Sequence, residues 1–86
     1  RMEYVLTPHA REEMVRRQID AAWVERVMKQ PEQKLPGVGN RVIFQARIAA
    51  QGKMFLVRCI VEDWRSPPAV VTVYRTTKIA KYWRQP

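Results

Sequence analysis

The chain of 86 residues has a single histidine, His9, directly after the pair Thr7-Pro8. This pair is typical of a helix start, because threonine caps a helix and proline fits the first helical position. His9 would then lie in the first turn, where free N–H groups and the helix dipole disfavour a positively charged imidazole. A neutral imidazole accepts a proton near pH 7, so His9 is a candidate general base. The alternative is a polar residue at a helix start with no chemical role.

The residue types needed for metal-free RNA cleavage are all present. Such cleavage requires a base for the ribose 2′-hydroxyl, cations beside the phosphate and an acid for the departing 5′-oxygen. A histidine, arginines and a tyrosine can fill these roles. Arginine binds phosphate through two parallel hydrogen bonds, and aromatic rings such as those of Tyr74 and Trp83 stack on unpaired bases. These residues indicate a protein that binds single-stranded RNA, with or without cutting it.

The positive charge is concentrated in the second part of the chain. Residues 1–32 carry six basic and six acidic side chains, whereas residues 33–86 carry ten basic and two acidic ones, and the net charge is +8. This excess favours a polyanion, RNA or DNA, or an acidic protein as partner. The alternative is a basic protein kept soluble by its charge. The basic residues lie in strand-like sequence rather than along an amphipathic helix, so we expect no membrane partner.

Metal and cofactor sites are not indicated. With one cysteine, Cys59, and one histidine, a zinc site would need mostly carboxylate ligands. We therefore expect a domain with neither metal nor cofactor. No apolar run approaches the roughly 20 residues needed to cross a bilayer, and the first residues lack the pattern of a signal peptide. We expect a cytoplasmic protein.

Two short helices must position His9. The first is predicted over about residues 8–17. Asp20 is typical of a helix cap and predicts a second helix over about residues 21–30. Apolar residues recur there at helical spacing: Trp23, Val24, Val27 and Met28. Residues 31–40 contain two prolines and two glycines and predict a loop.

From residue 41 onward, apolar residues recur at every second position, which predicts strands over residues 41–50 and 53–62. A two-residue turn at Gln51-Gly52 would form a hairpin in which Gln45 lies opposite Arg58. With this register the apolar sides of the two strands coincide. A shift by one residue would separate them, so the register is well specified.

A third strand is predicted over residues 69–75. Its alternation directs Val71 and Val73 toward the core and Thr72 and Tyr74 toward water. The water-facing side of the sheet would then gather five polar residues: Gln45, Arg47, Arg58, Thr72 and Tyr74. Neighbouring like charges on a sheet repel each other, so an anionic ligand would stabilise this side. The alternative is a sheet face that is polar because water touches it.

The last residues, 76–86, are basic and aromatic. Lys78 and Lys81 alternate with Tyr82 and Trp83 in a segment that predicts a short strand or a turn of helix. Both lysines are candidate contacts for nucleic acid.

The order helix, helix, strand, strand, strand predicts an α+β fold. Two N-terminal helices would pack on one face of an antiparallel sheet of three to four strands. We expect one domain over residues 1–86, with the sheet at about residues 41–84.

Both ends of the chain resemble a known family. YVLTPHAREEMVRRQI followed by AAWVERVMKQPE, and VVTVYRTTKIAKYW near the end, are similar to the bacterial domain of unknown function 4258. The opening motif is matched at His9, Ala10, Met14, Arg17 and Ile19. The looser closing motif is matched at Thr72, Tyr74, Lys78 and Tyr82. Family members often place arginine just before the methionine, where this chain has Glu13.

The resemblance implies a RelE-like fold, in which a helical pair precedes a curved antiparallel sheet. It also implies a metal-independent RNA endonuclease, often the toxin of a toxin–antitoxin pair, with an acidic antitoxin-like partner. The site residues that it implies are catalytic His9, Tyr74 and Thr72, and phosphate-binding Arg17 and Lys78. Strand register and charge add Arg47, Arg58 and Lys81 to the nucleic-acid-binding set.

The sequence thus predicts an RNA-binding domain that cleaves RNA without a metal ion, as an endoribonuclease of the toxin type. Its RNA would include mRNA on the ribosome. Two alternatives stay open. The first is a non-catalytic module whose basic sheet binds nucleic acid or an acidic protein. The second is a toxin-like domain that acts on a protein target.

Overall fold

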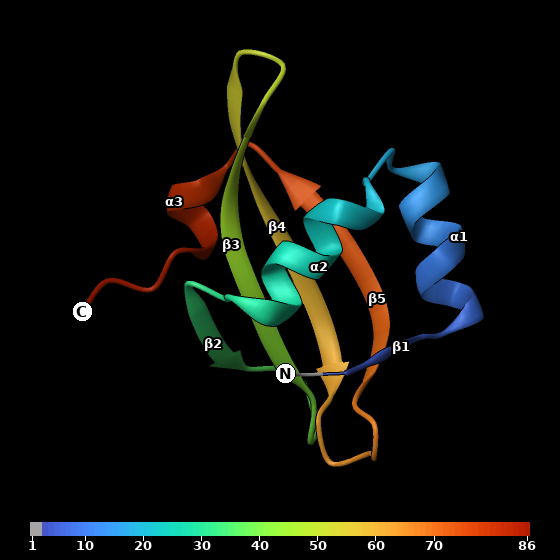
Figure 1. Cartoon of the computed structure of the whole chain (residues 1–86). Coiled ribbons are helices and arrows are strands. Elements are labelled where there is room, and N and C mark those ends of the chain that lie inside the picture. The colour runs from blue at the N-terminus through green and yellow to red at the C-terminus, as the bar shows by residue number, and fades with distance from the viewer. Residues whose placement is uncertain (1–2) are drawn as a thin grey trace.

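The structure is a computed structural model that describes residues 3–86. Along the chain its elements are β1 (Val5–Leu6), α1 (Pro8–Arg16), α2 (Ala21–Lys29), β2 (Gln33–Pro36), β3 (Val42–Ala50), β4 (Lys53–Glu62), β5 (Ala69–Thr76) and α3 (Ile79–Tyr82). They form the mixed α+β architecture of Figure 1. The predicted fold class is therefore confirmed.

The sheet has five strands in the order β1-β5-β4-β3-β2, rather than three to four. β1 pairs in parallel with β5, and the other neighbours are antiparallel. The two strands that the sequence did not predict lie at the two edges. β1 has only two residues, and β2 lies in the proline- and glycine-containing segment that predicted a loop. Proline is tolerated at an edge because one side of an edge strand needs no ladder hydrogen bond.

The two long helices take different places on the sheet. α2 packs across one face, against β3 and β4, whereas α1 lies beside β5 and β1 at the edge (Figure 1). We call the face covered by α2 the inner face and the opposite one the outer face. No helix within residues 3–86 is long and apolar enough to cross a membrane.

Both predicted helix caps are confirmed. Thr7 Oγ1 accepts a hydrogen bond of 3.1 Å from the Ala10 amide, and Asp20 Oδ1 accepts one of 2.9 Å from the Ala22 amide. These bonds satisfy amides that a helix start leaves without a partner. The Thr7 hydroxyl also donates to the Val71 carbonyl at 3.2 Å. This second bond fixes the start of α1 beside β5.

The predicted hairpin of β3 and β4 has the predicted register, with Gln45 opposite Arg58. The turn residues Gln51 and Gly52 have positive φ angles of 57° and 73°. Two successive positive φ values match the tight turn whose twist suits antiparallel strands. The alternation of β3 and β4 therefore sets which side chains reach the outer face.

One prediction for β5 is wrong. The ladder between β4 and β5 shifts between Ile60 and Val61, so Val71 is not the inner-face residue that simple alternation predicts. Val73 is fully buried as predicted, but Val70 is fully buried in place of Val71, which is half-buried. An extra residue in one strand changes the alternation beyond it, and no short-range sequence pattern marks its place.

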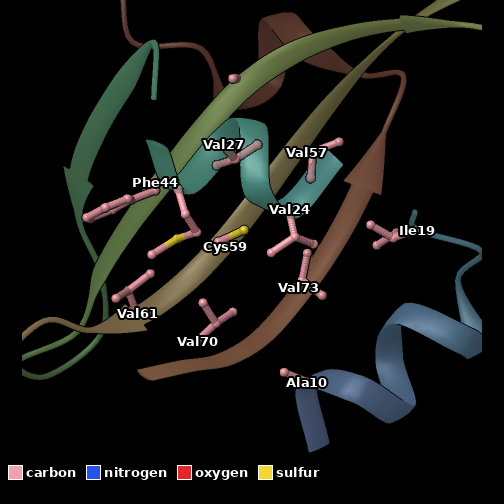
Figure 2. Packing of buried hydrophobic residues seen from close by; sticks show 12 residues of the cluster. Ala10, Ile19, Val24, Val27, Phe44, Val57, Cys59, Val61, Val70 and Val73 are labelled. Carbon is pink, nitrogen blue, oxygen red and sulfur yellow. The ribbon is translucent and has the colours of Figure 1, made fainter. Parts of the chain in front are cut away.

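The core lies between the inner face and the helices (Figure 2). β3 and β4 contribute Phe44, Val57, Cys59 and Val61, and all of these are at most 2% exposed. The helices, the segment between them and β5 add Ala10, Ile19, Val24, Val27, Met28, Val70 and Val73. Burial raises the pKa of the Cys59 thiol to about 12, so Cys59 behaves here as a small apolar core residue.

The end of the chain leaves the sheet. β5 stops at Thr76, and residues 79–82 form one helical turn, so the predicted sheet limit near residue 84 is wrong. Of the two forms predicted for this segment, the structure contains the helical turn. This turn and the residues after it contact the outer face through Gln33 and Gln45.

Candidate functional site

Arg58 lies at the centre of the outer face. Its Nε donates a 2.8 Å hydrogen bond to Gln45 Oε1, and its Nη1 donates to the Tyr74 hydroxyl oxygen. The guanidinium carbon lies 4.4 Å from the centre of the Tyr82 ring. As a result Arg58 is 6% exposed and Gln45 is fully buried. The prediction of a water-facing wall is therefore wrong at these two positions, because the C-terminal segment covers them.

The Arg58 guanidinium has no carboxylate partner in residues 3–86. None of the six ion pairs there includes it. Its hydrogen bonds use Nε and Nη1, which leaves Nη2 without an acceptor in the same residues. Burying a charge without an opposite charge is unfavourable. An anionic ligand beside Arg58 would supply the missing charge.

A chain of amide hydrogen bonds connects Arg58 with the C-terminal segment. Gln45 Nε2 donates to Gln33 Oε1 at 2.7 Å and to the Tyr82 carbonyl at 3.3 Å. The Gln33 side-chain amide then bonds the backbone of Arg84: its Nε2 donates to the Arg84 carbonyl at 2.7 Å, and its Oε1 accepts from the Arg84 amide at 3.1 Å. These bonds hold the Tyr82 ring over the guanidinium.

A second arginine lies on the other side of Tyr74. The guanidinium carbon of Arg17 is 5.8 Å from the centre of the Tyr74 ring, and that of Arg58 is 5.5 Å from it. Arg17 caps the C-terminal end of α1, so the helix end brings its side chain around β5. The structure thus brings together three predicted site residues, Arg17, Arg58 and Tyr74. We call these three the Tyr74 cluster.

Arg47 differs from Arg58 because it is neutralised within the protein. Its Nη2 lies 2.8 Å from Glu32 Oε2, and its Nε and backbone amide donate to Glu32 Oε1 at 3.2 and 2.7 Å. The Arg47 hydrogen bonds hold the pKa of Glu32 at about 2, well below its ordinary value. The guanidinium carbon also lies 4.2 Å from the Trp83 ring centre. The expected repulsion of unneutralised like charges does not apply at Arg47, because Glu32 neutralises its charge within the protein.

His9 lies outside the Tyr74 cluster. It is exposed in the first turn of α1, and no hydrogen bond from residues 3–86 reaches its imidazole. Arg17 follows eight residues later, about 12 Å farther along the helix axis at 1.5 Å per residue. The start of α1 is bonded to Val71, one residue before Thr72, so His9 lies nearer the Thr72 end of β5 than the Tyr74 cluster.

The remaining predicted site residues surround the cluster. Thr72 is half-buried opposite Ile60, on the same side of β5 as Tyr74. Lys78 and Lys81 are exposed, and neither forms an ion pair with another residue that the structure describes. They extend the positive surface from β5 to α3.

Within residues 3–86 no three His, Cys, Asp or Glu side chains gather closely enough to hold a metal ion. The chemistry available at the Tyr74 cluster is that of a phenol and two guanidinium groups. Such groups bind an oxyanion and exchange a proton with it.

Residues 6–75 match the family model described as a domain of unknown function, DUF4258. The chain belongs to the DUF4258 family. No curated protein and no solved structure matches it.

The range that matches DUF4258 includes one part of the candidate site and leaves out another. Every residue of the Tyr74 cluster lies inside the matched range, and so do His9 and Thr72. The C-terminal segment with Tyr82 and Trp83, which covers the cluster, lies after it. The cover on Arg58 is therefore built by residues outside the part of this DUF4258 chain that matches the family.

Sequence reasoning missed several residues around the cluster. Gln33 lay in a predicted loop, and nothing in the sequence indicates its bonds with Arg84, 51 residues later. The role of Glu13 was also missed: it is buried and binds two arginines. A usable signal existed here, since glutamate three and four residues before arginine is a standard helical ion-pair spacing.

Proposed function

We propose that this chain binds single-stranded RNA at the Tyr74 cluster and cleaves it without a metal ion, as a RelE-like endoribonuclease of the toxin type. The buried guanidinium of Arg58 carries this proposal, because it lacks a carboxylate and donates to the Tyr74 hydroxyl. A phosphodiester beside it would supply the missing negative charge. Arg17, on the other side of the ring, would bind the same phosphate.

The proposed cleavage is a transfer between two oxygens at one phosphorus. The ribose 2′-oxygen attacks the phosphorus and the 5′-oxygen leaves, while a base removes the 2′ proton and an acid protonates the 5′-oxygen. Tyr74 and His9 would fill these two roles, with Thr72 orienting the reacting groups. Both groups must act on one phosphodiester. Because His9 lies nearer the Thr72 end of β5 than the Tyr74 cluster, the scissile phosphodiester would have to lie over Thr72, between His9 and Tyr74.

Surface charge supports nucleic acid as the partner. The net charge is +8, and Lys78 and Lys81 border the cluster as exposed cations. An acidic antitoxin-like protein would be attracted to the same surface and would compete with RNA for it.

A matched pair of variants tests the chemistry. Tyr74→Phe keeps the ring under Arg17 but removes the hydroxyl, so it should bind labelled single-stranded RNA within about twofold of the parent. Its cleavage rate in EDTA should fall at least about a hundredfold, as should that of His9→Ala. An RNA with a 2′-deoxy sugar at the cleaved site should bind and stay intact. Parental cleavage rates in both variants would refute the two assignments.

The second candidate function is RNA binding without cleavage. It is favoured by the position of His9, which is exposed and lies outside the Tyr74 cluster. In that case the parent yields no product from any RNA, while Arg58→Met still weakens binding. Growth in a bacterial host separates the candidates: arrest that Tyr74→Phe abolishes supports the nuclease. Arrest that persists in both Tyr74→Phe and Arg58→Met supports a protein target.

A further inference from the structure

The side chain of Arg17 is held at a single nitrogen. Its Nε donates a 2.8 Å hydrogen bond to Glu13 Oε1, one helical turn earlier. Its two terminal nitrogens have no acceptor in residues 3–86. The guanidinium carbon lies 5.8 Å from the centre of the Tyr74 ring. Arginine binds a phosphate most strongly through two parallel hydrogen bonds, and the two terminal nitrogens of Arg17 are free to make them.

Glu13 is itself fixed, because Arg16 holds its carboxylate in place. Arg16 donates through Nε to Oε2 at 2.9 Å and through Nη2 to Oε1 at 2.7 Å. The Glu13 side chain is 11% exposed, and the hydrogen bonds from Arg16 and Arg17 lower the pKa of its carboxyl group to about 2. With both oxygens engaged, the carboxylate holds Arg17 by Nε and leaves the terminal nitrogens of Arg17 uncovered.

We propose that Glu13 is a positioning residue, which holds Arg17 so that its terminal nitrogens face a phosphodiester bound beside Tyr74 and Arg58. This inference rests on the proposed RNA binding at the Tyr74 cluster. It predicts an effect whose sign is opposite to that of simple electrostatics. A carboxylate near a polyanion repels it, so removing a carboxylate should strengthen binding. Removing this one should weaken binding, because Arg17 loses its orientation.

The test compares the dissociation constants of a fluorescent single-stranded RNA for Glu13→Ala, Glu12→Ala and the parent at one ionic strength. Glu12 is the exposed neighbour on the same helix, and its removal changes the net charge equally. We expect Glu13→Ala to bind about fivefold to tenfold more weakly, somewhat less than the value of one charge-assisted hydrogen bond, because Arg17 loses its orientation but keeps its charge. Glu12→Ala should bind as the parent or up to about twofold more tightly. Binding by Glu13→Ala as tight as by Glu12→Ala would overturn the proposal.

Two further variants separate positioning from folding. Glu13→Asp keeps the charge but shortens the side chain by one methylene, so it should also weaken binding. Glu13→Gln keeps an oxygen acceptor for Nε and should restore most of the affinity. Thermal unfolding of each variant gives the folded fraction, and Glu13→Asp decides the question if Glu13→Ala does not fold. Parental affinity in Glu13→Asp would contradict the proposal.

A double-mutant comparison then tests whether Glu13 acts through Arg17. In an Arg17→Ala background, Glu13→Ala should no longer weaken binding and should resemble Glu12→Ala. An equal loss in both backgrounds would overturn the proposal while leaving RNA binding itself intact. If the parent binds no RNA, the proposed function fails and this inference fails with it. The affinity of the parent therefore distinguishes the two failures.

Discussion

The two faces of β4 bury their side chains by different means. On the inner face, Val57, Cys59 and Val61 are fully buried among apolar neighbours. On the outer face Arg58 is almost as deeply buried, yet its contacts are an amide, a hydroxyl and an aromatic ring. Apolar burial stabilises a fold directly, whereas burial of an unpaired charge opposes folding. The comparison supports the proposal that the inner face maintains the structure and that the outer face binds a ligand.

A second arginine shows that an aromatic neighbour alone does not mark the site. Arg75 lies opposite Val57 on the inner face, 4.8 Å from the Phe55 ring centre. Its Nη1 is buried without a partner in residues 3–86. Within residues 3–86 the Arg75 side chain makes no hydrogen bond, whereas Arg58 donates to Gln45 and Tyr74. The difference between the two faces is therefore the convergence of polar groups at Tyr74.

The largest effect is expected on the inner face. Phe44 is 2% exposed, and Phe44→Ala should lower the free energy of unfolding by about 3–5 kcal/mol because it leaves a cavity in the core. Urea titration measures this loss. At a temperature where the variant is still folded, its RNA affinity should match that of the parent. A loss below about 1 kcal/mol would contradict the role assigned to the inner face.

Arg58→Met should change RNA affinity more than stability, the opposite of Phe44→Ala. The variant removes an unpaired buried charge but leaves Gln45 and Tyr74 each short of one donor, so these terms partly cancel. We expect the stability to stay within about 2 kcal/mol of the parent and the RNA affinity to fall about tenfold or more. The slope of log affinity against log salt should also decrease by about 0.7, the value for one phosphate contact on a single strand.

Arg75→Met is the matched control for Arg58→Met. It makes the same substitution and the same charge change on the neighbouring strand, but on the inner face. Its RNA affinity should remain within about twofold of the parent. If the two variants lose affinity equally, net charge rather than the Tyr74 cluster governs binding, and the comparison of the faces fails.

A smaller effect is expected from the neutralised arginine of the outer face. The pKa of Glu32 is about 2 in the folded protein and 4.5 ordinarily, so its pair with Arg47 contributes stability above pH 4.5. That contribution is lost as the pH falls from about 4.5 to about 2. Glu32→Gln should therefore lose less stability than the parent over this range, as measured by urea titration at each pH. Equal losses would contradict a stabilising pair.

Glu32→Gln also sharpens the contrast between the two arginines. It frees the Arg47 guanidinium while leaving Arg58 unchanged. If a bare arginine is what binds phosphate, RNA affinity at pH 7 should rise by a few fold. A fall would show that the Arg47–Glu32 pair, rather than free charge, forms part of the surface.

How much the sequence could predict follows from the range of the interactions. The caps at Thr7 and Asp20 and the register of β3 with β4 depend on residues close in sequence, and all were predicted. The cover on Arg58 depends on Gln33 and Arg84, which are far apart in the chain, and it was not predicted. The candidate site was therefore predicted in its residues but not in its burial. Alternation along a strand determines on which face of the sheet a side chain lies. Its burial depends on which other segments of the chain pack over that face.

The smallest predicted effect concerns the turn at Gln51-Gly52, which sets the register of β3 and β4 and therefore which side chains lie on each face. Gln51 has a φ of 57°, a conformation that costs glutamine more than asparagine. Gln51→Asn should therefore raise the free energy of unfolding by about 0.5–1 kcal/mol, measured by urea titration. Because Gln51 is exposed at the hairpin tip, it touches neither the core nor the Tyr74 cluster, and RNA affinity should not change. A change in RNA affinity would mean that the register of β3 and β4 varies in solution. Core stability and RNA binding would then depend on the same pairing and could not be changed separately.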